Sequence, residues 1–197
     1  MTGKLQRKNK LVYSVGINDA NYEIQPKIDG KLVRCPYYVV WKNMLSRCYR
    51  DEYQERNPTY KGCHVYPEWI YFMNFRRWMQ KQDWEGKELD KDLLIRGNKI
   101  YSPTTCVFVD AIINSFTLDC GRSRGEYPIG TYFNKEQRKF RSRCRNPFTK
   151  KLEHLGYFTC PNQAHLAWKK RKHELACQLA DLQTDPRVAE ALRTRYL

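Results

Sequence analysis

The sequence has neither a long hydrophobic run nor a closely spaced pair of cysteines. It contains no stretch of about 18 apolar residues, the length that a membrane-spanning helix requires. No apolar segment of the signal-peptide kind follows the basic first ten residues, so we expect a cytoplasmic protein with no membrane partner. The eight cysteines never occur as CxxC, which favours free, reduced thiols. The alternative is a structural zinc site drawn from Cys48, Cys63, Cys106 and a histidine.

Acidic residues are also scarce relative to basic ones. The chain has 36 Lys and Arg against 21 Asp and Glu, which gives a formal net charge of +15. A surplus of this sign attracts polyanions, so a nucleic acid is the expected partner. More than half of the surplus lies in residues 121–151, which hold ten basic and two acidic side chains. A second basic cluster near the start predicts a flexible arm over residues 1–30.

In the first half of the chain, the apolar positions predict helices more clearly than strands. Their spacing of three and four over residues 37–48 predicts an amphipathic helix, and aromatic residues between Trp69 and Trp78 outline a second one. The polar segment 51–62 is predicted to be a loop. Residues 86–98 alternate weakly and predict a hairpin, and a third helix is expected from about 102 to 112.

The second half reads differently after a glycine-bracketed polar link at 121–126, which we take as the domain boundary. Turn residues separate three short strand candidates, and a long helix with Pro161 at its first position follows them. A short helix is expected over 183–197. The prediction is an α+β protein in which a helical module precedes a three-stranded antiparallel sheet packed on one helix. The strands are expected at 130–134, 139–145 and 154–158, and the long helix at 161–182.

The segment KFRSRCR, at 139–145, has the most informative pattern. Because successive side chains of a strand point to opposite faces, its basic residues share one face and its small or apolar residues share the other. The small face suits packing against an alanine-rich helix, so the basic face should be exposed. A row of like charges costs stability unless anions lie opposite, which favours contact with a nucleic acid over a merely solvated strand. The basic residues are Lys139, Arg141, Arg143 and Arg145.

Four motifs in this half, taken in order, resemble the Apetala/ethylene-response-factor DNA-binding domain. They are Gly130-Thr131-Tyr132-Phe133, Lys139-Phe140-Arg141-Ser142-Arg143, His154-Leu155-Gly156-Tyr157-Phe158 and Gln163-Ala164-His165-Leu166-Ala167-Trp168.

This resemblance covers about 127–180, within a DNA-binding domain expected at 127–182, and implies a sheet that enters the major groove of double-stranded DNA. Arg141, Arg143, Arg145 and Tyr132 would then contact DNA, although for Tyr132 the family likeness is the sole support. Phosphate contacts are expected from Lys135, Lys139, Lys150 and Lys151. Binding of this kind requires no cofactor.

Residues 31–120 resemble the HNH-type endonuclease module, with its ββα element, of phage proteins described as homing-endonuclease-like. The matching residues are Trp41-Lys42-Asn43-Met44, Arg47-Cys48-Tyr49, Tyr60-Lys61-Gly62-Cys63-His64-Val65 with Trp69, Leu89-Asp90-Lys91-Asp92, Tyr101-Ser102-Pro103-Thr104-Thr105-Cys106, and Asn114. The family needs a histidine base and a divalent cation.

The catalytic pattern of that family is incomplete in this chain. The general-base position holds Lys91, and the middle asparagine position holds Thr105. Asp90 and Asn114 match the pattern, and Asp92 adds a carboxylate that could help Asp90 to hold Mg²⁺ or Mn²⁺. His64 is the one candidate for a replacement base. The competing interpretations are that the two carboxylates balance Lys91 and that His64 is structural.

We therefore expect a phage-type protein that binds double-stranded DNA, in the host cell cytoplasm. One alternative is a metal-dependent HNH-type homing endonuclease or nickase. The other is a phage inhibitor of a host protein, which need carry no recognisable motif. The sequence indicates neither the target site nor the oligomeric state.

Overall fold

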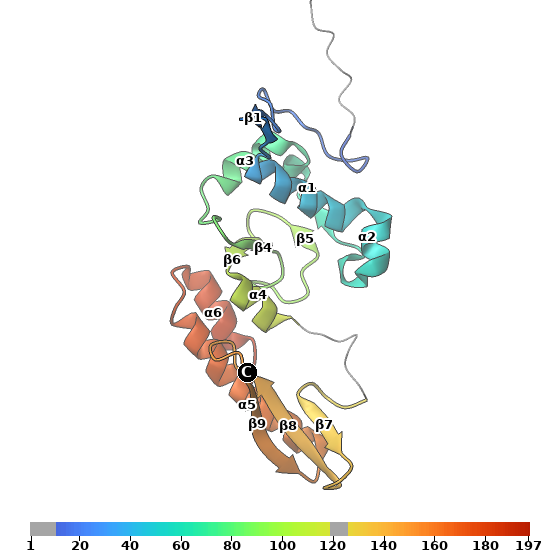
Figure 1. The fold of residues 1–197 in the computed structure, drawn as a ribbon, viewed down its shortest axis with the longest axis vertical. Helices are drawn as coiled ribbons and strands as arrows, with labels where there is room; N and C mark the ends of the chain where they lie inside the picture. Colours follow the sequence, from blue (N-terminus) through green and yellow to red (C-terminus); the bar gives the residue numbers. More distant parts are fainter. Residues whose placement is uncertain (1–10, 119–125) are drawn as a thin grey trace, which may run out of the picture. The chain divides into compact units, whose positions relative to one another are not determined.

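The computed structural model describes residues 11–118 and 126–197, which form two compact units divided between Val109 and Asp110 (Figure 1). The predicted link at 121–126 falls almost wholly outside the described residues, as do residues 1–10 of the predicted arm. The helix that contains Asn114 belongs to the second unit, whereas the sequence placed it in the first module. Within the described ranges, no helix is long and apolar enough to cross a membrane.

Helices and aromatic side chains build the first unit. Helix α1 (Pro36–Tyr49) lies along its core, and the indole Nε1 of Trp41 donates to the carbonyl oxygen of Trp69 at 2.7 Å. Gly16 lies so close to α1 that a Cβ atom there would come within 2.3 Å of Leu45, so this part of the predicted arm packs against the unit. The helical segments are α1 (Pro36–Tyr49), α2 (Asp51–Arg56), η1 (Pro58–Tyr60), η2 (Pro67–Ile70) and α3 (Phe72–Met79).

Two helix predictions for this unit need correction. The predicted loop at 51–62 is wrong, because α2 and η1 occupy it. Gln54 donates to the carbonyl oxygen of Cys48 at 2.6 Å, and Asp51 and Glu52 lie in the first turn, where acids favour a helix. The second predicted helix is interrupted at Tyr71, whose backbone is extended, so Trp69 lies on η2.

The strands of the first unit are short and pair in three separate sheets. The pairs are antiparallel β1 (Lys27–Ile28) with β2 (Lys31–Leu32), parallel β3 (His64–Val65) with β5 (Ile100–Tyr101), and antiparallel β4 (Glu88–Asp90) with β6 (Val107–Val109).

The predicted hairpin at 86–98 and the predicted helix at 102–112 are therefore wrong. The run Val107–Val109 is buried at every position, a pattern that a strand and a helix share, and its pairing with β4 makes it a strand. Helix α4 (Ala111–Thr117) follows this strand directly, so the chain runs from β5 through β6 to α4.

The second unit has the predicted α+β architecture. Strands β7 (Thr131–Asn134), β8 (Lys139–Arg145) and β9 (Leu152–Phe158) form an antiparallel sheet in that order, and α5 (Pro161–Ala180) packs against it. Helix α6 (Pro186–Thr194) in turn packs on α5. The bounds predicted for β8 are confirmed, and α5 begins at Pro161 as expected, with no side-chain cap from Cys160.

The backbone comes very close to α5 at Gly130, the residue directly before β7. This residue has φ +80°, and a Cβ atom there would come within 2.1 Å of the Trp168 ring. On β8, Ser142 and Cys144 are fully buried beneath the helix. The face of the sheet that carries these two side chains is called the inner face below, and the opposite one the outer face.

Candidate nucleic-acid interface

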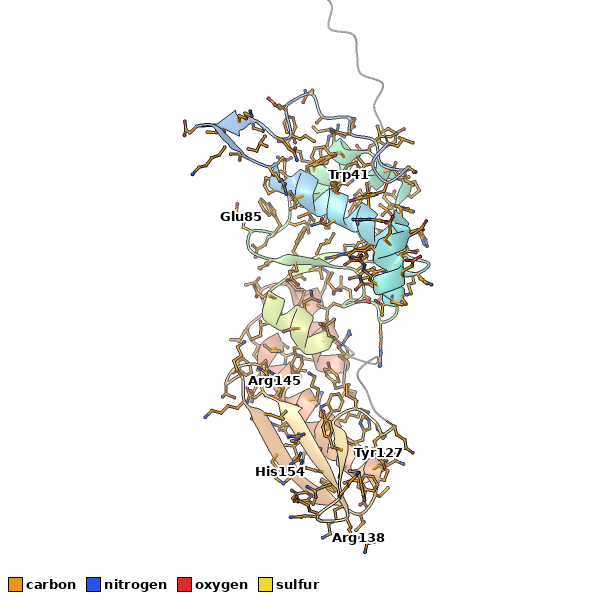
Figure 2. The ribbon with its side chains drawn as sticks, turned by 45° about the vertical axis from the view of Figure 1, so that its right-hand side comes forward. Trp41, Glu85, Tyr127, Arg138, Arg145 and His154 are labelled. Carbon is orange, nitrogen blue, oxygen red and sulfur yellow. The ribbon has the colours of Figure 1, made fainter. Side chains whose placement is uncertain are left out.

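The three arginines of β8 lie on the outer face. Exposure alternates along the strand: Ser142 and Cys144 are buried, whereas Arg141 and Arg143 are partly exposed and Arg145 is exposed. The arginine register predicted from alternation is thus confirmed. In Figure 2, Arg138 lies in the turn before β8 and Arg145 at the other end of this strand.

A β-bulge in β9 completes the outer face. Arg141 pairs with Tyr157 and Arg143 pairs with His154, so one residue of β9, Leu155, has no partner on β8. The neighbouring Gly156 has φ +126°, a conformation that favours glycine. The bulge brings His154 and Tyr157 to the same face, where their rings make an edge contact with 4.8 Å between the ring centroids.

The three strands carry one acidic residue, and it lies on the inner face. Glu153 pairs with Cys144, and its carboxylate accepts from Arg171 Nε at 2.7 Å and from Asn146 Nδ2 at 2.7 Å. These hydrogen bonds hold the pKa of Glu153 below its ordinary value. The inner acid therefore serves the packing of α5 and leaves the charge of the outer face uncompensated.

The arginines of β8 have few partners within the described part of the chain. Among the described residues, Arg141, Arg143 and Arg145 form no ion pair, and the covered Nε atoms of Arg141 and Arg143 have no hydrogen-bond partner. Buried donors are normally paired, so within the described chain no acceptor compensates for the burial of these two Nε atoms. Tyr132 is half exposed beside them, with the Arg143 guanidinium carbon 4.8 Å from its ring centroid.

The predicted phosphate-binding lysines are all exposed. Lys139 opens β8, Lys135 lies in the turn between β7 and β8, and Lys150 and Lys151 lie in the connection between β8 and β9. None of them has a carboxylate partner within the described part of the chain. They extend the positive charge of the outer face to both ends of the sheet.

The structure gives Lys91 a different role from that of a general base. Its ammonium group is buried, donates to Asp92 Oδ2 at 3.0 Å and to the Asn98 carbonyl oxygen at 3.1 Å, and lies near the rings of Tyr60 and Tyr101. Burial, the largest single effect, acts to lower the pKa of Lys91, but the charge and the hydrogen bond of Asp92, together with smaller effects of Cys63 and Asp90, oppose it and the pKa is raised. Lys91 is thus protonated at neutral pH and cannot accept a proton from water.

The two carboxylates beside Lys91 have structural partners as well. Asp90 Oδ1 accepts from the backbone amides of Asp92 and Leu93 at 2.8 and 2.6 Å, which closes a turn at the end of β4. Burial raises the pKa of Asp90, and the nearby negative charge of Asp92 raises it further. Because β4 ends at Asp90, the two acids do not lie together on one strand. The ion pair of Asp92 with Lys91 matches the competing interpretation for this one acid, whereas the hydrogen bonds of Asp90 go to backbone amides.

The other positions of the predicted catalytic pattern lie on separate elements. His64 is exposed on β3, with Nδ1 3.4 Å from the Gly62 carbonyl oxygen. Thr105 donates to the Ile100 carbonyl oxygen at 2.7 Å. Asn114 lies on α4 in the second unit, whereas Asp90 lies in the first.

The three cysteines considered for zinc are buried in the first unit. Burial raises the pKa of the Cys48 and Cys106 thiols to about 12, and it also raises the pKa of Cys63. Zinc binds the thiolate form. Among residues 11–118 and 126–197, no three His, Cys, Asp or Glu side chains are grouped so as to hold a metal ion.

No family model, no curated protein and no solved structure matches this chain. The two family resemblances therefore stay predictions from the motifs.

Proposed function

We propose that the protein binds double-stranded DNA through the outer face of its three-stranded sheet. The observation that carries the proposal is the segregation of charge across the sheet. Arg141, Arg143 and Arg145 share the outer face and have no acidic partner among residues 11–118 and 126–197, while Glu153 is hydrogen-bonded on the inner face. Such a surface attracts a polyanion and repels itself in the absence of one.

The geometry suits a DNA groove better than a flat anionic surface. The B-DNA major groove is about 12 Å wide and admits a β-ribbon, and arginine can donate two hydrogen bonds to guanine O6 and N7. Arg141 and Arg143 occupy the centre of the face, where base edges would lie. Lys135, Lys150 and Lys151, at the ends of the sheet, are placed for phosphates.

Salt dependence and matched variants test this proposal. If about six to ten phosphates are neutralised, log K for a duplex should fall with log salt with a slope of about −5 to −9. Arg141→Ala and Arg143→Ala should each weaken binding by about 1–3 kcal/mol. Arg96→Ala, an exposed arginine of the first unit, removes the same charge as a control. Equal dissociation constants for all three variants and the parent protein would reject the outer face.

The buried, protonated Lys91 argues against water activation by the first unit, so DNA cleavage is the weaker alternative. Incubation of supercoiled plasmid with Mg²⁺ or Mn²⁺ should leave it intact, and neither metal should increase the affinity for DNA. Nicking that persists in Arg96→Ala and disappears in Asp90→Asn would instead establish the endonuclease. Within the part of the chain that the structure describes, no surface favours inhibition of a host protein over either of these functions.

A further inference from the structure

The outer face has a shallow hollow at the end nearest the turn between β7 and β8. Its lining residues are Tyr132, Phe133, Asn134, Lys135, Glu136 and Arg141. Tyr132 and Arg141 are paired across β7 and β8, so the hollow is continuous with the arginine row. It therefore belongs to the surface proposed above to face DNA.

Glu136 is the one carboxylate that lines this hollow, and its position is costly for a surface that binds phosphates. The side chain is exposed and forms neither an ion pair nor a hydrogen bond with the described residues. Stabilisation of the fold therefore does not explain it. The turn itself is held by another residue, since Asn134 Oδ1 accepts from the Gln137 backbone amide at 2.9 Å.

A carboxylate in a DNA groove can be useful only where it meets a hydrogen-bond donor. The major-groove edge offers such donors on two bases, the N4 amino group of cytosine and the N6 amino group of adenine. Guanine and thymine present the acceptor oxygens O6 and O4 at the corresponding place, which a carboxylate repels. A glutamate at this place thus discriminates amino-bearing from keto-bearing bases.

We infer that Glu136 is a specificity-determining residue and that the hollow receives the edge of a cytosine or adenine. This inference rests on the proposed DNA-binding function. Glu136 accepts from the exocyclic amino group, while the Arg141 guanidinium, which also lines the hollow, donates to an acceptor of the same or a neighbouring base pair. Tyr132 bounds the hollow with its half-exposed ring.

Selection from randomised duplexes tests the inference directly. The full-length protein and the variant Glu136→Gln are each used to select bound duplexes of 20 random base pairs. The parent protein should enrich A or C at one position by about 5- to 160-fold over G or T, the range expected for one base contact. Glu136→Gln should lose that preference while it keeps the others.

The affinity for a duplex of unrelated sequence gives a second readout, which should not fall when the base preference is lost. Loss of a negative charge near phosphates should leave unchanged or increase the affinity for a fixed duplex of unrelated sequence. Glu190→Gln, an exposed acid on α6, is the matched control and should retain the full preference. An equal thermal midpoint for the three proteins shows that folding is intact.

The outcomes separate this inference from the proposed function. Identical base preferences in the parent protein and Glu136→Gln would overturn the role of Glu136 while duplex binding stands. Equal loss of preference in Glu136→Gln and Glu190→Gln would reduce the effect to net charge and would also overturn it. Failure of the parent protein to retain any duplex would refute both proposals.

Discussion

The guanidinium group of Arg143 lies over the ring of Tyr132, with 4.8 Å between the guanidinium carbon and the ring centroid. Tyr132 is paired with Arg141, so it contacts the next arginine along β8 diagonally. A cation above an aromatic face is attracted to it and loses part of its rotational freedom. The stack therefore holds one arginine of the outer face in a fixed orientation before any ligand arrives.

Removal of the Tyr132 ring should therefore weaken DNA binding, although Tyr132 need not contact DNA itself. Tyr132→Leu should weaken duplex binding about two- to fivefold, which corresponds to about 0.5–1 kcal/mol for an exposed cation–π contact. Tyr132→Phe keeps the ring and should bind like the parent protein. Fluorescence anisotropy with a labelled duplex measures both. A hydroxyl that contacts DNA would instead make the two variants equally weak.

The buried Lys91 ammonium should contribute to the stability of the first unit. Lys91→Ala leaves Asp92 and the Asn98 carbonyl oxygen without their donor, and should lower the free energy of unfolding by about 1–3 kcal/mol. Lys87→Ala removes a lysine that is ion-paired with the exposed Asp83, and should cost about 0.5 kcal/mol or less. Urea denaturation compares the two variants. Equal losses would contradict a structural role for Lys91.

Asp90 should behave as a turn residue whose charge is unfavourable. Its raised pKa means that its contribution to stability is largest at low pH and is lost as the pH rises through the folded-state pKa. Asp90→Asn keeps the acceptor oxygen for Asp92 and Leu93, so it should be as stable as the parent protein or more stable at pH 7. Asp90→Ala should lose about 1–2 kcal/mol. Thermal unfolding at pH 7 and pH 4 tests the sign.

Gly130 should be irreplaceable for the packing of the sheet on α5. Gly130→Ala places a methyl group on the Trp168 ring at a residue with φ +80°, so we expect a loss of about 3 kcal/mol or more. Gly97→Ala is the control, because Gly97 has φ +77° with open space around it and should cost only about 1 kcal/mol. Denaturant unfolding that gives similar losses for both would show that the contact with Trp168 is unimportant.

Glu153 should make the second unit sensitive to acid. Its pKa is lowered by hydrogen bonds from Arg171 and Asn146, so its contribution is present above its ordinary value of 4.5 and is lost as the pH falls through the folded-state pKa. The carboxylate is partly exposed, which limits the effect to about 1 kcal/mol. The stability difference between the parent protein and Glu153→Gln should shrink between about pH 5 and pH 3. A constant difference would contradict this linkage.

The sequence predicted the second unit better than the first, and the reason is the length of the elements. Strand β8 has seven residues and a strict alternation, and α5 has 20 residues with a proline at its start. The strands of the first unit have two or three residues, too few to show a period, and their partners are distant in the sequence. Pairings such as His64 with Ile100 follow from tertiary contacts alone.

The candidate site was predictable where it depended on one strand. Alternation places Arg141, Arg143 and Arg145 together, but it assigns His154 and Tyr157 to opposite faces of β9. The bulge between them inserts one unpaired residue, so the two side chains lie on the same face. In the sequence His-Leu-Gly-Tyr, the glycine is the only residue that indicates a bulge. The role of Lys91 could not be predicted either. It depends on a hydrogen bond to Asn98, and the sequence predicted a hairpin for the segment that joins these two residues.

The bulge at Leu155 has a further consequence for the electrostatic potential of the sheet. If β9 continued from Phe158 to Leu152 without the extra residue, Glu153 would stand opposite Arg145 on the outer face, and His154 would turn inward. The carboxylate would then neutralise the nearest guanidinium, and Arg171 on α5 would lose its acceptor. The one extra residue in β9 thus places the carboxylate beside the helix and leaves the guanidinium groups facing solvent. It therefore determines that the electrostatic potential met by an approaching ligand is positive.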